Sequence, residues 1–120
     1  MANYKELQVF IKAFDLAMNI FNISKKFPSD ELFGLTSQIR RSSRSVCTNI
    51  AEGYRKRRYP AHFISKMTDA DMENSETIVW LDFALGCGYI DNQTNLALSQ
   101  QADEIGRILY FMIENPKKFS

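Results

Sequence analysis

Basic side chains are concentrated in one short stretch of the sequence, and their chemistry is the most evident in the chain. Positions 40 to 58 hold seven bases and one acid, a local sum of +6, whereas the net charge of the whole chain is +1. Guanidinium groups bind phosphate oxygens through paired, charge-assisted hydrogen bonds. We therefore predict a nucleic-acid-binding surface for structured RNA or DNA, formed by Arg40, Arg44, Arg55, Lys56, Arg57 and Arg58. Tyr54 and Tyr59 lie within the same stretch and can stack on unpaired bases or pack in the core.

An acidic stretch follows the basic one and offers an alternative partner for the arginines. Positions 61 to 90 hold Lys66 as their single Lys or Arg against five acids, which are Asp69, Asp71, Glu73, Glu76 and Asp82. Two adjacent helices of opposite charge can neutralise each other without any nucleic acid. The sequence leaves both interpretations open. If the charges pair internally, the protein is better described as an interaction scaffold for other proteins.

Arg57 and His62 are separated by four residues, a spacing similar to the active-site motif of the higher-eukaryote-and-prokaryote nucleotide-binding ribonucleases. In that motif the histidine helps a ribose hydroxyl attack its own phosphate, and the arginine stabilises the developing charge. The simpler interpretation is a histidine at a helix start beside a solvated basic loop. We therefore expect no enzyme, and a metal-independent ribonuclease is the remote alternative. With a single histidine and no close pair of ligands, we predict neither a metal nor a cofactor.

Helices must position these side chains, because apolar residues recur at intervals of three and four along the chain. The chain has 120 residues with only 5 glycines and 3 prolines, which favours a few long helices over many short strands. We predict helices at about 7–26, 30–57, 60–86 and 94–114 in a single domain covering 1–120. Short connections between long helices predict an all-α, up-down-up-down antiparallel four-helix bundle.

The predicted helix at 30–57 has three distinct sides if it continues through Gly53. An apolar side faces the core and holds Leu32, Leu35, Ile39, Val46 and Ile50, with Ser42 and Ser43 in its gap. A third side carries Arg40, Arg44, Arg55 and Arg58. Between them runs a polar stripe, which we predict to be a subunit interface because a monomeric bundle needs only one dry and one wet side. The stripe consists of Gln38, Arg41, Ser45, Asn49 and Glu52 and continues to Lys56. Alternatively, these residues form a hydrogen-bonded seam inside one protomer.

Other patterns in the sequence predict the apolar side of the first helix, the state of the cysteines and the cellular compartment. In the first helix, one side is expected to be shared by Leu7, Phe10, Phe14, Ala17 and Phe21, and the apolar surface is expected to be widened by Leu16, Ile20 and Ile23. Cys47 and Cys87 are not spaced as a CxxC pair, so we expect reduced, buried thiols. The sequence has neither an export signal nor an apolar run approaching the ~18 residues of a membrane span, so we expect a cytoplasmic protein without a membrane partner.

The central stretch resembles a known family. The matching residues are Phe27-Pro28, the segment from Leu35 to Arg41, Ser45, and the segment from Asn49 to Gly53. They are similar to the four-helix-bundle proteins encoded in intervening sequences of bacterial 23S ribosomal RNA genes, which are related to the accessory protein of diversity-generating retroelements. The resemblance implies a ring-like homopentamer. For the retroelement relatives it also implies binding to nucleic acid and to a reverse transcriptase, although those relatives are strongly basic and this chain is almost neutral.

Overall fold

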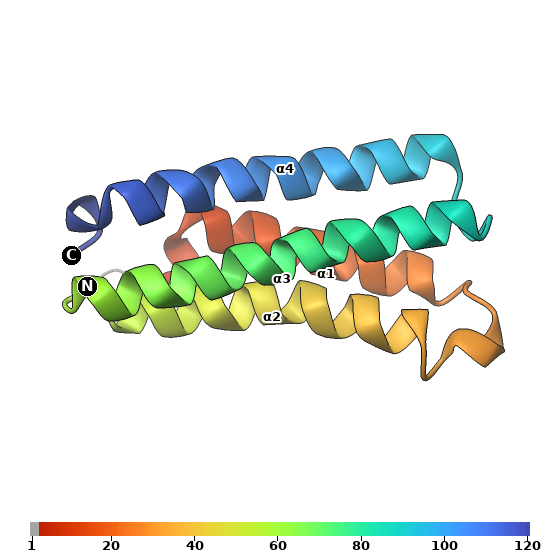
Figure 1. The fold of residues 1–120 in the computed structure, drawn as a ribbon, viewed down its shortest axis with the longest axis horizontal. Helices are drawn as coiled ribbons and strands as arrows, with labels where there is room; N and C mark the ends of the chain where they lie inside the picture. The colour runs from red at the N-terminus through yellow and green to blue at the C-terminus, as the bar shows by residue number, and fades with distance from the viewer. Residues whose placement is uncertain (1–2) are drawn as a thin grey trace.

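Four antiparallel helices make up the computed structural model, which describes residues 3–120 (Figure 1). They are α1 (Gln8–Ser24), α2 (Leu35–Arg55), α3 (Pro60–Gly86) and α4 (Asn92–Glu114). Short 3-10 turns η1 (Tyr4–Glu6), η2 (Ser29–Glu31) and η3 (Pro116–Lys118) flank them. Each helix packs against its sequence neighbours, and α1 closes the bundle against α4. The described residues contain no strand, so the predicted all-α, up-down-up-down four-helix bundle is confirmed.

The second helix begins later than predicted. Residues 29–31 form a 3-10 turn, and Gly34 has backbone angles outside the helical region, so α2 starts at Leu35. The carboxylate of Glu31 accepts a hydrogen bond from the backbone N–H of Leu35 at 3.1 Å, which satisfies one free donor of the first turn. Leu32 therefore lies outside the helix and is 50% exposed. Its assignment to the apolar side of the helix was wrong.

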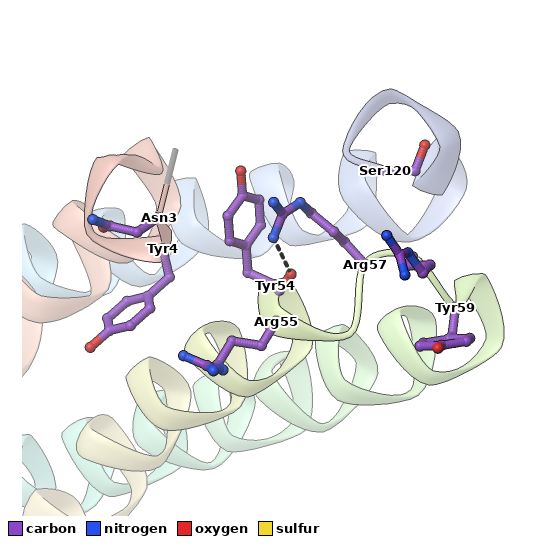
Figure 2. A pocket seen from close by; sticks show the side chains of 8 residues that line it. Asn3, Tyr4, Tyr54, Arg55, Arg57, Tyr59 and Ser120 are labelled. Atoms are coloured by element: carbon purple, nitrogen blue, oxygen red, sulfur yellow. Dashed lines mark hydrogen bonds between the residues drawn. The ribbon is translucent and has the colours of Figure 1, made fainter. Parts of the chain in front are cut away.

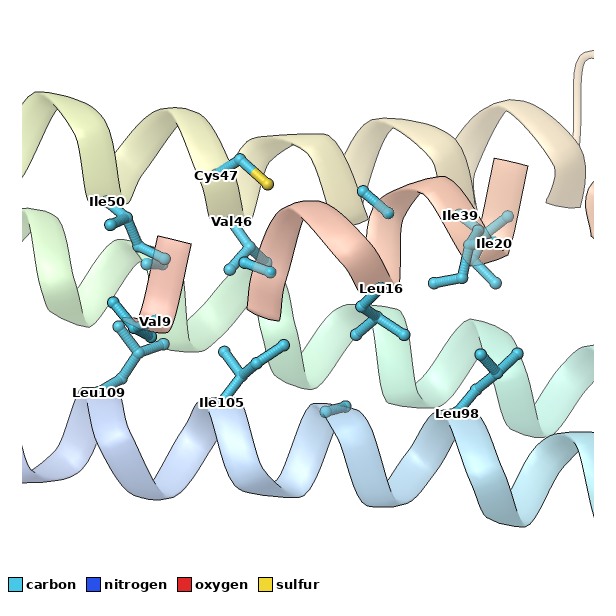
Figure 3. Packing of buried hydrophobic residues seen from close by; sticks show 14 of the residues in the cluster. Val9, Leu16, Ile20, Ile39, Val46, Cys47, Ile50, Leu98, Ile105 and Leu109 are labelled. Atoms are coloured by element: carbon cyan, nitrogen blue, oxygen red, sulfur yellow. The ribbon is translucent and has the colours of Figure 1, made fainter. Parts of the chain in front are cut away.

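The core lies along the line where all four helices face inward (Figure 3). In α1 the inward line consists of Val9, Ala13, Leu16 and Ile20, not of the phenylalanines. Phe14 is 51% exposed, and of the predicted side only Ala17 is buried. The reason is geometric: α1 touches both α2 and α4, and the side that faces the space between them is rotated away from Phe14.

Small polar side chains complete the contact between α2 and α3. Ser42 and Ser43 are buried, as their place in the apolar side predicted. The Ser42 hydroxyl lies 2.8 Å from the Thr77 hydroxyl of α3, and Ser43 donates to the carbonyl of Ile39 at 2.8 Å. These hydrogen bonds offset the cost of burying hydroxyl groups.

Gly53 lies where α2 packs tightly against Lys66 and Met67 of α3. The helix continues through it to Arg55, as the three-sided interpretation required. A Cβ atom added there would lie 2.5 Å from Cε of Met67 and 2.8 Å from Cβ of Lys66. Glycine is needed here because any side chain would separate the two helices.

The two cysteines differ in exposure, so the expectation that both are buried was half wrong. Cys47 is buried between α1 and α2, and this burial raises the pKa of its thiol to about 11. Cys87 is exposed because it follows the end of α3 in the turn toward α4. Among the described helices, none is long and apolar enough to cross a membrane.

A thiol-modifying reagent is expected to distinguish the two cysteines in the native protein. With a pKa of about 11, roughly one Cys47 thiol in 10³ is ionised at pH 8, and only the thiolate reacts. We therefore expect iodoacetamide at pH 8 to label Cys87 at least tenfold faster than Cys47, as read by peptide mass spectrometry. A Cys87→Ser protein should lose the fast phase. Equal labelling rates of the two thiols would contradict the burial of Cys47.

Candidate nucleic-acid interface

The basic residues predicted from the sequence fall into two groups, one along α2 and one at its end. The first group lines a shallow depression of about 460 Å³ on the outer surface of α2, which we call the α2 hollow. Three guanidinium groups and four hydroxyl groups surround it, together with Leu32, and none of its lining residues is acidic. Its polar residues are Thr36, Ser37, Arg40, Arg41, Arg44, Ser45 and Thr48.

Two of these arginines are held in place by α1 without losing their charge. The Nε–H of Arg40 donates to the hydroxyl of Ser24 at 2.8 Å. The guanidinium carbons of Arg40 and Arg44 lie 4.8 and 5.7 Å from the centre of the Phe21 ring. Cation–π contacts and a hydrogen bond to a neutral hydroxyl orient a guanidinium but do not neutralise it. Within residues 3–120, neither arginine forms an ion pair.

Arg41 is the member of the α2 hollow that pairs with the acids of α3. Its guanidinium donates to Glu73 at 2.9 and 3.3 Å and to Glu76 at 2.6 Å. Hydrogen bonds to Glu73 and Glu76 raise the pKa of Arg41. Burial works against ionisation of Glu76, but hydrogen bonds from Arg41 and Trp80 outweigh it, so the pKa of Glu76 is lowered. Neutralisation by α3 therefore applies to Arg41, whereas in the described part of the chain Asp69, Asp71 and Asp82 form no ion pair.

The second basic group lies at the end of the bundle. Because α2 ends at Arg55, Arg58 is not on the same helical side as Arg40 and Arg44, which corrects the predicted third side. Instead, Arg55, Arg57 and Arg58 line a second depression of about 540 Å³, which we call the end hollow (Figure 2). Its other lining residues are Asn3, Tyr4, Tyr54, Tyr59 and Ser120. Lys56 is exposed and lines neither hollow.

The partners of these bases come from segments that the sequence did not connect to them. Phe21 and Ser24 of α1 position the arginines of the α2 hollow. Tyr4 and Ser120 reach the end hollow from opposite ends of the described chain. Phe21 was expected on the apolar side of the first helix, and no signal in the sequence pointed to its contact with these arginines. No signal in the sequence pointed to Ser120.

The predicted subunit-interface stripe runs along the flank of α2 next to α3. Arg41 binds Glu73 and Glu76, and Glu52 accepts from the Lys66 ammonium group at 2.8 Å. Asn49 donates to the carbonyl of Ser45 within its own helix at 2.9 Å, and Gln38 is exposed. The side chains of Arg41 and Glu52 thus have ion-pair partners on α3 of the same protomer, as the alternative of an internal seam predicts. The role of the row Gln38, Arg41, Ser45, Asn49 and Glu52 in subunit contact stays a prediction.

Arg57 and His62, the pair suggested by the ribonuclease-like spacing, have separate surroundings. The guanidinium of Arg57 lies 4.1 Å from the centre of the Tyr54 ring and donates to the Tyr54 carbonyl at 2.9 Å. His62 is exposed in the first turn of α3, with its ring 6.1 Å from that of Tyr59. His62 does not line the end hollow. Across residues 3–120, there is no group of three or more His, Cys, Asp or Glu side chains placed to hold a metal ion.

Comparison with known proteins identifies the family. The family model described as "23S rRNA-intervening sequence protein" matches residues 5–111. The chain belongs to this family. Both the basic stretch and the α2 hollow lie inside the matched region, whereas Asn3, Tyr4 and Ser120 of the end hollow lie outside it.

A solved structure that is similar to this chain has the same fold. It is a protein of unknown function from the S23 ribosomal protein family of Bacteroides thetaiotaomicron, 28% identical in sequence, with a TM-score of 0.79. The similarity covers 88% of this chain and 95% of the relative. No curated protein matches the chain.

Proposed function

We propose that this protein is a non-enzymatic homo-oligomer that binds structured RNA or DNA through the basic side of α2. The observation that carries the proposal is the α2 hollow. It presents Arg40 and Arg44 without an ion-pair partner among residues 3–120, and hydroxyl groups of Ser37, Ser45 and Thr48 surround them. Arginine and hydroxyl side chains are the groups that bind phosphate oxygens and sugars in nucleic-acid complexes. Binding through them is independent of base sequence and weakens with salt.

Two exposed apolar surfaces support self-association. The α1 surface consists of Ile11, Phe14 and Met18, which are 43–51% exposed, and the α3 surface consists of Met72, Val79 and Phe83, which are 48–66% exposed. Helices α1 and α3 both pack against α2 and do not touch each other in the described bundle, so the two surfaces are separate and lie on either side of α2. A contact between two different surfaces is head-to-tail and closes into a ring when its rotation permits.

Ring assembly would strengthen nucleic-acid binding. Each copy adds an α2 hollow to the same assembly, so a weak single site becomes a strong multivalent one. The homopentamer, the kinship with the accessory protein of diversity-generating retroelements and a reverse-transcriptase partner belong to this proposal. They are suggested by the sequence resemblance, and the two apolar surfaces agree with a ring.

Removing the charges of the α2 hollow is expected to weaken binding to a duplex RNA. For an Arg40→Ala/Arg44→Ala protein we expect the slope of log K against log salt to become shallower by about 2 and the affinity at low salt to fall roughly 10- to 100-fold. Fluorescence anisotropy across a salt series measures both quantities. An Arg107→Ala/Lys117→Ala protein is the matched control, because both bases are exposed, lie outside the α2 hollow, and their loss changes the net charge equally.

Two results would count against the proposal. One is a parent protein that binds no RNA or DNA at low salt, and the other is a double variant that binds as the parent does. If native partners copurify and persist after nuclease treatment while purified protein binds no nucleic acid, the protein-interaction scaffold is the better description.

A further inference from the structure

The end hollow differs from the rest of the basic surface in its shape and in its aromatic content. It is formed where α2 turns into α3, beside the first and last segments of the described chain (Figure 2). Its volume of about 540 Å³ falls within the range of ~300–1,000 Å³ that is typical of small-molecule sites. By size alone it can hold one nucleotide.

Its lining residues have the chemistry of a site for an aromatic phosphate ester. Residues with three guanidinium groups and three phenol rings line the hollow, and none of its lining residues carries a side-chain carboxylate. The cations are Arg55, Arg57 and Arg58, and the rings belong to Tyr4, Tyr54 and Tyr59. Arginines bind phosphate oxygens in paired geometry, and tyrosine rings stack on bases.

One of the arginines is already held in place. Stacking on the Tyr54 ring and donation to the Tyr54 carbonyl fix the guanidinium of Arg57, so little further ordering is needed when an anion binds. Arg55 and Arg58 are exposed and form no ion pair in the part of the chain that the structure describes. Tyr59 is 58% exposed, which leaves ring surface for a base.

We infer that the end hollow binds a phosphomonoester carrying a nucleobase, in the form of the terminal phosphate and terminal base of a nucleic-acid strand. A terminal phosphate carries a charge of about −1.5 to −2 at pH 7, whereas an internal phosphodiester carries −1. A cluster of three guanidinium groups without a side-chain carboxylate among the lining residues favours the higher charge. A strand end can also enter a hollow, whereas an internal phosphate is attached to nucleotides on both of its sides, and both would have to fit.

The inference rests on the proposed function, because it assigns the strand end to the end hollow and the duplex backbone to the α2 hollow. The same chemistry is offered by a free nucleotide such as adenosine monophosphate. Calorimetry with adenosine monophosphate alone therefore belongs in the test, since it detects a site for free nucleotides in the absence of any strand.

The test compares single-stranded RNAs of about 12 nucleotides, labelled internally and ending in either a phosphate or a hydroxyl at one end. By anisotropy with the full chain, we expect the phosphorylated strand to bind about tenfold more tightly. An Arg55→Ala/Arg58→Ala protein should lose this preference, so that it binds the phosphorylated and the hydroxyl-ended strand with equal affinity. An Arg40→Ala/Arg44→Ala protein should bind both strands more weakly and keep the preference.

Each other outcome has a distinct meaning. If the parent binds both strands equally, the inference fails and the proposed function survives. If neither strand nor a duplex binds, the proposed function fails. Calorimetry with adenosine monophosphate alone then tests whether the end hollow binds a nucleotide. A heat of binding that the parent shows and Arg55→Ala/Arg58→Ala lacks supports a free-nucleotide site. The absence of any heat of binding in the parent overturns the inference. Preference for the phosphorylated strand that persists in Arg55→Ala/Arg58→Ala places the phosphate elsewhere and also overturns it.

Discussion

Replacing Gly53 by alanine is expected to lower the free energy of unfolding by about 1–3 kcal/mol, because even one methyl group overfills the contact between α2 and α3. An added Cβ would lie 2.8 Å from Cβ of Lys66, which cannot move away without its helix. It would also lie 2.5 Å from Cε of Met67, which is flexible but completely buried. The helix propensity gained by replacing glycine, ~1 kcal/mol, opposes this loss but does not cancel it. Gly53→Val should destabilise the bundle further.

Gly86 provides the matched control for this substitution. It is the last residue of α3, and a Cβ added there would meet nothing within 4 Å. The same change to alanine at Gly86 is therefore expected to be neutral or to stabilise the protein by up to ~1 kcal/mol. Urea denaturation of both variants and the parent at one protein concentration measures the difference. A Gly53→Ala protein as stable as Gly86→Ala would show that the helices separate there at no cost.

The sequence predicted the four helices well because the apolar period is strong, but it could not orient α1. Apolar residues cover most of the circumference of that helix, so its period alone does not select the inward side. Val9, Ala13 and Leu16 face the core, while Phe14 on the flank next to α2 is half exposed. The choice depends on the positions of α2 and α4, which the local sequence does not contain.

The basic residues could also be recognised from the sequence, but their pairing could not. Arg40 and Arg41 are neighbours in the chain and point about 100° apart around the helix. Consequently Arg40 contacts Ser24 of α1, whereas Arg41 reaches Glu73 and Glu76 of α3. A local charge sum treats the two as equivalent. Only the register of α2 against its neighbours determines which guanidinium stays free to bind phosphate.

Replacing Phe14 or Phe83 by aspartate is expected to dissociate the proposed ring. Each phenylalanine is about half exposed, 51% and 56%, so an aspartate there is hydrated in the monomer and should permit folding. In a subunit contact the same carboxylate would be buried without a partner, at a cost of about 2–5 kcal/mol per contact. That cost weakens each contact by roughly 30- to 4,000-fold. Native mass spectrometry of each variant should show monomers, with circular dichroism confirming the helices.

Leu96→Asp is the matched control, because Leu96 is 59% exposed on α4 and belongs to neither apolar surface. It should leave the assembly intact. A parent protein that is monomeric, or a Leu96→Asp protein that dissociates as completely as Phe14→Asp, would contradict the assignment of the two surfaces.

Mixing the two variants tests the head-to-tail geometry itself. A Phe14→Asp subunit retains its α3 surface, and a Phe83→Asp subunit retains its α1 surface, so one intact contact remains between them. The mixture should therefore form a one-to-one heterodimer that cannot grow, because both of its free ends carry an aspartate. If each surface instead paired with its own kind, the mixture could form no contact between the α1 surface of one variant and the α3 surface of the other. Each variant alone would then dimerise through its unaltered surface, and the mixture would contain the two homodimers without a heterodimer. The two geometries thus differ in the species present before mixing as well as after it.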